Sequence, residues 1–440
     1  MRSVAAAVLD RCLAERLPLA GLLRLAAAPL AERDRALLRS LVLGTTRWLR
    51  RIDAVLEAAS SRPPARIDPA LMAPLRIAVY QLLFLDRVPA HAAVDEAVGE
   101  ARRRSHRAAA GFVNAVLRKV ARAPRLDHWP VAERDPLRHL AIDTSHPDSL
   151  VRRWHDRFGG AAARRLLAAN NREKPLQLLA FRDRGGPRRL ARALAEEGVE
   201  TRPAELSPLG LTVVAGDPLA GDAFDRGDLY LQDDASQAAA LVPPPAAGET
   251  VLDAAAAPGG KSFALAAWEP GVRLTLADVS APRLPPLRAN LRRLDRLLPL
   301  LVADARRPAS RARFDRVVVD LPCSGSGTLR RHPELKWRIG DDELERLSAQ
   351  GLEMLAGVAA AVRPGGLLVA ITCSLEEEEN EHVVERFLAR RGDFALEPVI
   401  AGLPPSMHAG GGEAGLWRVL TDGDHDGFSV HILRRRRGGR

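Results

Sequence analysis

The chain has 440 residues, a hydrophobic content of 47% and a formal net charge of +10. This length exceeds one ordinary hydrophobic core and predicts two or three domains. No apolar stretch is long enough to span a membrane, and three scattered cysteines cannot build a disulfide framework, so we expect a cytoplasmic protein. The positive charge indicates a polyanionic partner.

Lysine is rare in this chain. Only four of the 65 lysine and arginine residues are lysines, the usual result of a GC-rich coding bias. Two of the four, Lys261 and Lys336, lie in loops that carry other candidate site residues. A compact ammonium can act there in ways that a planar guanidinium cannot.

Residues 1–135 are predicted to form a helical domain. Apolar residues recur at helical spacing, Pro69 stands where a helix can begin, and Pro89 separates two helices. A further amphipathic run, Gly111–Arg122, lies beside a basic cluster that includes Arg118 and Lys119. Such a cluster is as often a solvated helix face as a binding surface. We expect these two cations to contact RNA.

Residues 145–225 are expected to form a small α/β module. Asp143–Ser145 can cap a helix that runs from Pro147 to about Asn171. Strands at 176–181 and 209–214 should flank a second helix at 187–197. The pattern indicates no active site in this module.

Residues 228–435 alternate between strands and helices, which predicts a parallel, Rossmann-like α/β sheet. Ligands bind at the carboxyl ends of the strands in such sheets. Two later segments, 419–420 and 428–433, are expected to form a closing antiparallel pair. The parallel strands are predicted at Thr250–Asp253, Leu274–Asp278, Leu300–Asp304, Val317–Asp320 and Leu367–Thr372.

Acidic residues end the first three of these strands. The first strand leads into a glycine-rich turn, Asp253–Lys261, which opens a helix. A nucleotide-phosphate loop is the rival interpretation, but neither G-x-G-x-x-G nor a Walker A pattern is present. Asp278 stands where a ribose-binding acid belongs, and Asp304 where an adenine contact would lie. The pattern predicts a pocket for an adenosine-containing ligand without a polyphosphate.

Two cysteines follow strands at the same predicted sheet edge. Cys323 comes shortly after Asp320, and Cys373 directly follows the strand that ends at Thr372. Cys12, on an apolar helix face, is expected to be buried and inert. The loop after Cys323 adds cations and an indole ring suited to a phosphate backbone and an unpaired base: Arg330, Arg331, His332, Lys336 and Trp337. We therefore expect chemistry on a nucleic-acid base.

These motifs resemble the Sun (RsmB-like) family of RNA cytosine-C5 methyltransferases over nearly the whole chain. The matching segments are Asp320–Gly325 with Arg330–Pro333, Thr372–Ser374, Pro258–Lys261, Gln232–Gln237 and Asp426–Phe428. The N-terminal helices, with Ala78–Gln81 and Gly111–Arg118, resemble the NusB-type RNA-binding domain. The resemblance implies a NusB-like domain (1–135), a small α/β module (145–225) and a class I methyltransferase domain (228–435).

The resemblance also implies residue roles. Cys373 would attack C6 of cytosine, Cys323 would assist release, and Asp320 would hydrogen-bond the base. Lys261 and backbone dipoles would help ionise the nucleophilic thiol, since a free thiol is mostly protonated at neutral pH. S-adenosylmethionine would be bound by residues of four loops: Ala256, Ala257, Pro258, Gly259, Gly260, Lys261, Asp278, Arg283, Asp304, Asp320 and Pro322.

The expected substrate is an unpaired or flipped cytosine of 16S rRNA, with no membrane, no metal and a monomeric enzyme. One alternative is the same reaction on tRNA or large-subunit rRNA. Another is a non-catalytic RNA-binding or antitermination factor that uses the methyltransferase fold as a scaffold. Because both cysteines, Asp320 and the cofactor acids are present, we favour the enzyme.

Overall fold

The computed structural model describes the chain except for residues 87, 106, 123–133, 308–313, 413 and 438–440. The described residues divide into two compact units. Unit 1 comprises Met1–Arg172 and Leu329–Ile339, and unit 2 comprises Glu173–Thr328 and Gly340–Arg440. The predicted boundaries at 135, 145, 225 and 228 stay a prediction. No helix in the described part of the chain is long and apolar enough to cross a bilayer.

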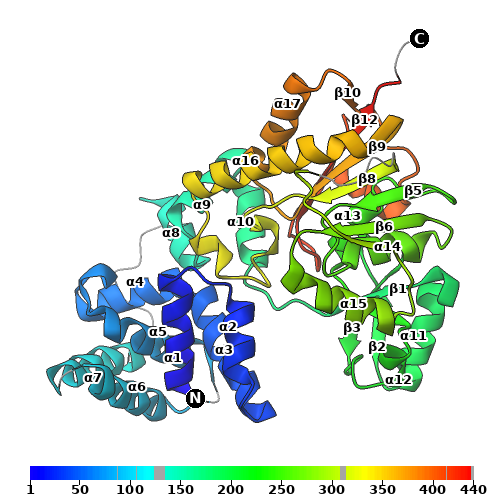
Figure 1. Cartoon of the computed structure of the whole chain (residues 1–440). Coiled ribbons are helices and arrows are strands. Elements are labelled where there is room, and N and C mark those ends of the chain that lie inside the picture. The colour runs from blue at the N-terminus through cyan, green and yellow to red at the C-terminus, as the bar shows by residue number, and fades with distance from the viewer. Residues whose placement is uncertain (87, 106, 123–133, 308–313, 413, 438–440) are drawn as a thin grey trace. The chain divides into compact units, whose positions relative to one another are not determined.

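Unit 1 contains helices and no strand among its described residues (Figure 1). The predicted starts at Pro69 and after Pro89 are confirmed, and Asp68 caps the first of these helices by accepting from the Ala70 N–H. The apolar faces of the first seven helices share one core. The helices are α1 (Arg2–Ala14), α2 (Leu19–Ala27), α3 (Glu32–Arg47), α4 (Leu49–Ser60), α5 (Pro69–Phe84), α6 (Ala90–Arg104), α7 (Arg107–Arg122), α8 (Pro136–Asp143), α9 (Asp148–Phe158) and α10 (Gly160–Ala169).

The prediction of a single helix from Pro147 to Asn171 is wrong, because the structure has two helices there, α9 and α10. Gly159 adopts φ +78°, a left-handed conformation that favours glycine, and it separates α9 from α10. The expected cap is also absent, since α9 has no side-chain cap. Ser145 instead accepts the N–H groups of Arg50 and Arg51 at the start of α4.

Unit 2 begins with a four-stranded antiparallel sheet in the order β2-β3-β1-β4. The two predicted strands and the predicted helix are confirmed. Two further strands were not predicted: β2, which is mostly exposed, and β4, which has three residues. The elements are β1 (Gln177–Ala180), α11 (Gly186–Glu196), β2 (Glu200–Pro203), β3 (Gly210–Ala215), α12 (Asp222–Asp225) and β4 (Leu229–Leu231).

The larger sheet of unit 2 has the order β10-β12-β9-β8-β5-β6-β7, with β11 paired to β12. Strands β5 to β9 are parallel as predicted, although β7 ends at Val302, before Asp304. The expected antiparallel pair is β11 and β12. The elements are α13 (Asp234–Ala240), β5 (Thr250–Asp253), α14 (Gly260–Trp268), β6 (Arg273–Asp278), α15 (Leu284–Arg293), β7 (Leu300–Val302), β8 (Phe314–Asp320), α16 (Asp341–Val358), β9 (Val362–Thr372), α17 (Glu381–Arg390), β10 (Phe394–Leu396), β11 (Leu416–Val419) and β12 (Phe428–Arg435).

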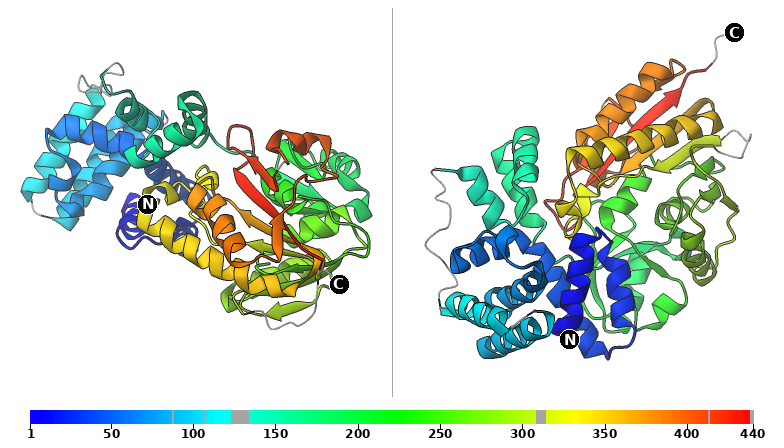
Figure 2. Two further views of the ribbon diagram at one scale, coloured as in Figure 1. Left: turned by 90° about the horizontal axis from the view of Figure 1, so that it is seen from above. Right: turned by 60° about the vertical axis from the view of Figure 1, so that its left-hand side comes forward.

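Helices cover both faces of this sheet (Figure 2). Val317 and Val319 of β8 pack with residues of α16 and α17, whereas Val318 packs with residues of α13 and α14. A strand that is covered on both faces needs apolar residues at consecutive positions, which explains the run Val317–Val319 in β8. The core thus holds β8 firmly, and its carboxyl end presents Asp320.

Candidate active site

The two cysteines lie side by side at the carboxyl edge of the larger sheet. β8 and β9 are parallel neighbours, with Asp320 opposite Ile371, so the residues that follow them emerge together. The Sγ atoms of Cys323 and Cys373 are 3.5 Å apart, within hydrogen-bond range for sulfur. Both side chains are partly exposed. The expected proximity of the thiols is confirmed, and their roles stay a prediction.

A backbone clasp joins the loops that carry these thiols. The Gly327 N–H donates to the Cys373 carbonyl at 2.9 Å, and the Gly427 N–H donates to the Gly327 carbonyl at 2.8 Å. A Cβ atom at Gly327 would lie 2.2 Å from the Gly427 carbonyl oxygen. This close approach explains the glycine at position 327 of the Cys323 loop.

Lys261 and Asp320 form an ion pair beside the thiols, with 2.6 Å between Nζ and Oδ2. Burial opposes the charge on Lys261, but the Asp320 carboxylate, together with Cys373 and Asp253, outweighs this effect, and the pKa of the ammonium is raised. Lys261 also lies over the Phe428 ring. It is therefore a fixed cation that orients one oxygen of Asp320.

Cys323 is the thiol that holds its proton. Its hydrogen bond with Cys373 and its burial raise the pKa of Cys323 well above the ordinary range, and the nearby Glu379 charge adds to this. Cys323 is therefore favoured as the donor and Cys373 as the acceptor of the contact between the two sulfur atoms. Cys12 is buried as expected, and burial raises its pKa to about 11.

Asp278 ties two loops together at the end of β6. Its Oδ2 accepts from the Ala257 N–H at 3.0 Å and its Oδ1 from the Ser280 N–H at 2.8 Å. The side chain is 4% exposed. Each carboxylate oxygen has a second lone pair, so the group can still accept hydrogen bonds from a ligand.

The glycine-rich turn needs a glycine at position 259 for its own packing. Gly259 has φ +116°, and a Cβ there would lie 2.3 Å from the Phe263 ring. The packing of the turn against α14 thus requires glycine, whether or not a ligand approaches. Asp253 below the turn is buried, accepts from the Ser262 hydroxyl at 2.7 Å, and has its pKa raised by burial to about 6.

Asp304 lies in the turn after β7 rather than at the strand end. Its carboxylate accepts from the Arg306 backbone N–H and binds the guanidinium of the same residue at 2.7 Å, contacts that lower its pKa. Arg283 is exposed before α15, and Pro322 is partly buried next to Cys323. Their cofactor roles stay predictions.

The chain matches three known protein families and is similar to known ribosomal RNA methyltransferases over most of its length. Residues 240–433 match the model of "16S rRNA methyltransferase RsmB/F", residues 1–122 match the NusB family, and residues 146–219 match the ferredoxin-like domain of RsmF/B-like methyltransferases. The ribosomal RNA small subunit methyltransferase B of Pasteurella multocida is 31% identical over 99% of this chain and 96% of its own length. A Bacillus subtilis protein named "Probable ribosomal RNA small subunit methyltransferase B" is 33% identical over 83% of this chain and 82% of its own length.

The chain belongs to the RsmB/F family of 16S rRNA methyltransferases. The crystal structure of PH0851 superimposes with a TM-score of 0.78 at 27% identity, covering 99% of this chain and 98% of that one. The predicted fold class is thereby confirmed: a NusB-like helical domain, a small α/β module and an α/β methyltransferase domain.

One RNA-contacting segment predicted for this RsmB/F family member is packed inside unit 1. Lys336 is 1% exposed, and its Nζ donates to the Arg47 carbonyl at 2.7 Å. The Trp337 indole N–H donates to the Thr46 carbonyl, and Arg330, 2% exposed, donates to the Ala169 carbonyl. The prediction that Lys336 and Arg330 contact RNA is therefore wrong for this structure, because both side chains are buried.

The remaining predicted RNA contacts have accessible side chains. Arg331 is exposed, and His332 and Trp337 are half-buried. On α7, Arg118 is exposed and donates to Asn114. Lys119 is also exposed and donates to the carbonyls of Ala58 and Ala59 near the end of α4. RNA binding by these residues stays a prediction.

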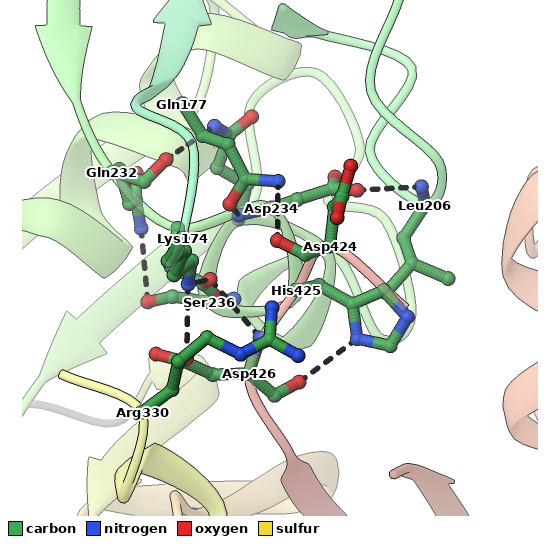
Figure 3. A network of polar contacts seen from close by, with 12 residues as sticks. Lys174, Gln177, Leu206, Gln232, Asp234, Ser236, Arg330, Asp424, His425 and Asp426 are labelled. Carbon is green, nitrogen blue, oxygen red and sulfur yellow. Dashed lines mark hydrogen bonds and ion pairs between the residues drawn. The ribbon is translucent and has the colours of Figure 1, made fainter. Parts of the chain in front are cut away.

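Lys174, which was not predicted as a site residue, lies in a buried network near the start of β1 (Figure 3). Its ammonium pairs with Asp233 and, at 2.9 Å, with Asp426, whose backbone N–H also donates to Asp233. Asp426 precedes the Gly427 that contacts the Cys323 loop. The rarity of lysine was the signal that could have identified this residue.

The neighbouring Asp234 holds the loop before β3 in the same region (Figure 3). Its carboxylate accepts three consecutive backbone N–H groups, those of Glu205, Leu206 and Ser207, at 2.8, 2.8 and 2.6 Å. These contacts give the Gln232–Gln237 motif a structural role. Among the described residues, no group of three or more His, Cys, Asp or Glu side chains is arranged to hold a metal ion.

Proposed function

We propose that this family member transfers a methyl group from S-adenosylmethionine to C5 of a cytosine in small-subunit rRNA, through a covalent cysteine adduct. The observation that carries the proposal is the pair of thiols 3.5 Å apart beside the Lys261–Asp320 ion pair. Methylation at a carbon atom of a pyrimidine ring requires a nucleophile and then a means of release, and two thiols supply both.

The residues at the sheet edge fit the proposed cofactor. Asp278 retains acceptor capacity for ribose hydroxyls after its two backbone contacts, and Lys261 is already paired with Asp320 rather than available for a phosphate chain. The residues that would hold the cofactor are Ala256–Lys261, Asp278, Arg283, Asp304, Asp320 and Pro322. When bound, S-adenosylmethionine supplies an electrophilic methyl group.

Cys373 begins the reaction by adding to C6 of the cytosine. A bond forms between its thiolate sulfur and C6. The C5–C6 bond becomes single, a C4–C5 double bond forms, and N3 takes up a proton, which leaves an enamine in which C5 is nucleophilic. The free oxygen of Asp320 accepts a hydrogen bond from the Watson–Crick edge and favours a proton on N3, which makes C6 more electrophilic. Lys261 holds Asp320 in position through the other oxygen.

Cys323 ends the reaction. Its raised pKa depends first on the hydrogen bond to Cys373, and bonding of Cys373 to C6 removes that cause. Cys323 then ionises more readily and takes the proton from C5. The electrons of the broken C5–H bond restore the C5–C6 double bond, and the bond from C6 to Cys373 breaks to release a thiolate.

Replacement of each cysteine separately tests this order of events. Cys373→Ala should abolish methylation without a covalent adduct. Cys323→Ala should allow addition and methylation but stall at elimination, leaving protein bonded to methylated RNA. A denaturing gel with radiolabelled RNA and cofactor distinguishes these species. Cys12→Ala is the matched control and should methylate without trapping RNA. An adduct trapped only by Cys373→Ala would reverse the assignment, and full methylation by both active-site variants would refute the mechanism.

A further inference from the structure

Each active-site cysteine is followed by a serine that hydrogen-bonds the same buried carboxyl group. Ser324 follows Cys323, and both its backbone N–H and its hydroxyl donate to Glu379, each at 2.7 Å. Ser374 follows Cys373, and its hydroxyl also hydrogen-bonds Glu379. Ser324 and Ser374 are 8% and 0% exposed. One side chain therefore connects the loops of both thiols.

Glu379 is buried without a counter-ion. It lies on the short turn Glu377–Glu379 after β9 and is 2% exposed. In the described part of the chain, no ion pair joins it to a lysine, arginine or histidine. Burial raises its pKa to about 7, an effect that Ser374 and Ser324 partly offset.

We propose that Glu379 is a positioning residue that holds Cys323 against Cys373 through Ser324 and Ser374. This inference rests on the proposed function, since it assigns Glu379 to the step in which Cys323 releases the product. The Ser324 N–H is adjacent to Cys323, so its bond to Glu379 sets the direction of that peptide. Without this bond, Cys323 loses its alignment with the adduct while Cys373 can still attack.

The hydrogen bonds that a side chain at position 379 can form predict which substitutions keep the contacts to Ser324 and Ser374. A glutamine at this position can accept from the Ser324 N–H through its oxygen and donate to the Ser324 hydroxyl through its amide nitrogen. Glu379→Gln should therefore preserve the loop. Glu379→Ala removes every contact to both serines, and Ser324→Ala removes one of the two contacts from that residue.

The measurement is the ratio of trapped adduct to released methylated RNA in the full-length protein. This ratio compares two fates of the same adduct, so a lower folded fraction does not change it. Glu379→Ala should raise the ratio about tenfold, the effect of roughly 1.4 kcal/mol on the release step. Ser324→Ala should raise the ratio by a smaller factor, and Glu379→Gln should keep the wild-type ratio. Glu377→Ala, an exposed acid of the same turn, is the matched control.

The possible results distinguish a failure of the positioning role of Glu379 from a failure of the proposed cysteine mechanism. If Cys323→Ala traps no adduct, the proposed mechanism fails. If Cys323→Ala traps an adduct but Glu379→Ala and Ser324→Ala both keep the wild-type ratio, the positioning role of Glu379 is overturned. A Glu379→Gln variant that traps as much adduct as Glu379→Ala would also overturn it, because the neutral hydrogen bonds would then be insufficient.

Discussion

At the scale of single residues, the lysines show how a rare residue type marks specific contacts. Each lysine meets oxygen acceptors inside its own unit, although three of them, Lys119, Lys261 and Lys336, were expected to face a ligand or RNA. Lys336 is the most constrained, since burial and then the Arg47 charge lower its pKa well below the ordinary range. A lysine can lose its proton in such a place, whereas an arginine cannot. The acceptors are the Ala58 and Ala59 carbonyls for Lys119, Asp233 and Asp426 for Lys174, Asp320 for Lys261, and the Arg47 carbonyl for Lys336.

Lys336→Arg should therefore destabilise unit 1 more than Lys336→Met does. The guanidinium stays charged without an acid partner, and an uncompensated buried charge costs about 3 kcal/mol or more. Thermal unfolding followed by circular dichroism should show the larger drop in transition temperature for arginine. Arg331→Lys, at an exposed position of the same segment, is the control. Equal stability of the Lys336→Arg variant and the wild type would contradict the burial of this ammonium.

The buried acids give stability a definite pH dependence. The pKa of Glu379 is about 7 in the folded chain against an ordinary 4.5, so the folded state binds more protons between these values. Stability must then fall as pH rises through that window, by roughly 3 kcal/mol for this group. Glu379→Gln should remove this decline, so its advantage over the wild type should grow from pH 4.5 to pH 8. Denaturation at both pH values measures the difference, with Glu377→Gln as the control.

Replacement of Asp278 tests the proposed S-adenosylmethionine site. Asp278→Ala should weaken S-adenosylmethionine binding by about 1–3 kcal/mol, the scale of lost hydrogen bonds in a buried polar site. Isothermal titration calorimetry gives the affinity directly. Since Asp278 also holds the Ala257 and Ser280 N–H groups, Asp278→Asn serves as the comparison that keeps a polar side chain. An unchanged affinity in the alanine variant would remove Asp278 from the cofactor site.

At the scale of elements, the active site is an arrangement of loops fixed by backbone contacts. Gly327→Ala should lower methylation at least about tenfold, because its Cβ would overlap the Gly427 carbonyl and open the clasp to Cys373. Gly340→Ala is the matched control, since a Cβ at Gly340 meets no atom within 4 Å. Initial rates of methyl transfer are the measurement. Wild-type rates in Gly327→Ala would show that the clasp does not position the thiols.

Much of the methyltransferase sheet could be predicted because its strands are short apolar runs that end in acids. Those runs place both thiols at the carboxyl edge of the sheet, whereas the pairing of β8 with β9, which brings the thiols together, is seen only in the structure. The glycine clasp, Glu379 and Lys174 could not be predicted in the same way, because their contacts join segments far apart in the sequence. Lys336 and Arg330 were misassigned for a related reason: a basic, aromatic segment has the same composition whether it faces RNA or packs against helix carbonyls.

At the scale of the whole molecule, RNA affinity is expected to depend on unit 1. Arg118→Glu in the full-length chain should weaken rRNA binding and reduce the salt dependence of binding by about one or two counterions. Fluorescence anisotropy across a salt series measures both quantities. Arg24→Glu, an exposed charge reversal in α2, is the comparison for net charge. A loss no greater than that of Arg24→Glu would exclude a specific contact at Arg118.

The segment Leu329–Ile339 restricts how the domains of this family can be exchanged. It is encoded between two parts of unit 2, yet its partners Arg47, Thr46 and Leu19 belong to the N-terminal helices. A chimaera that takes its N-terminal domain from one relative and its remaining sequence from another would combine this segment with N-terminal helices of a different sequence. A viable exchange therefore has to transfer two separate stretches of gene, so that the segment and the helices it packs against come from the same relative.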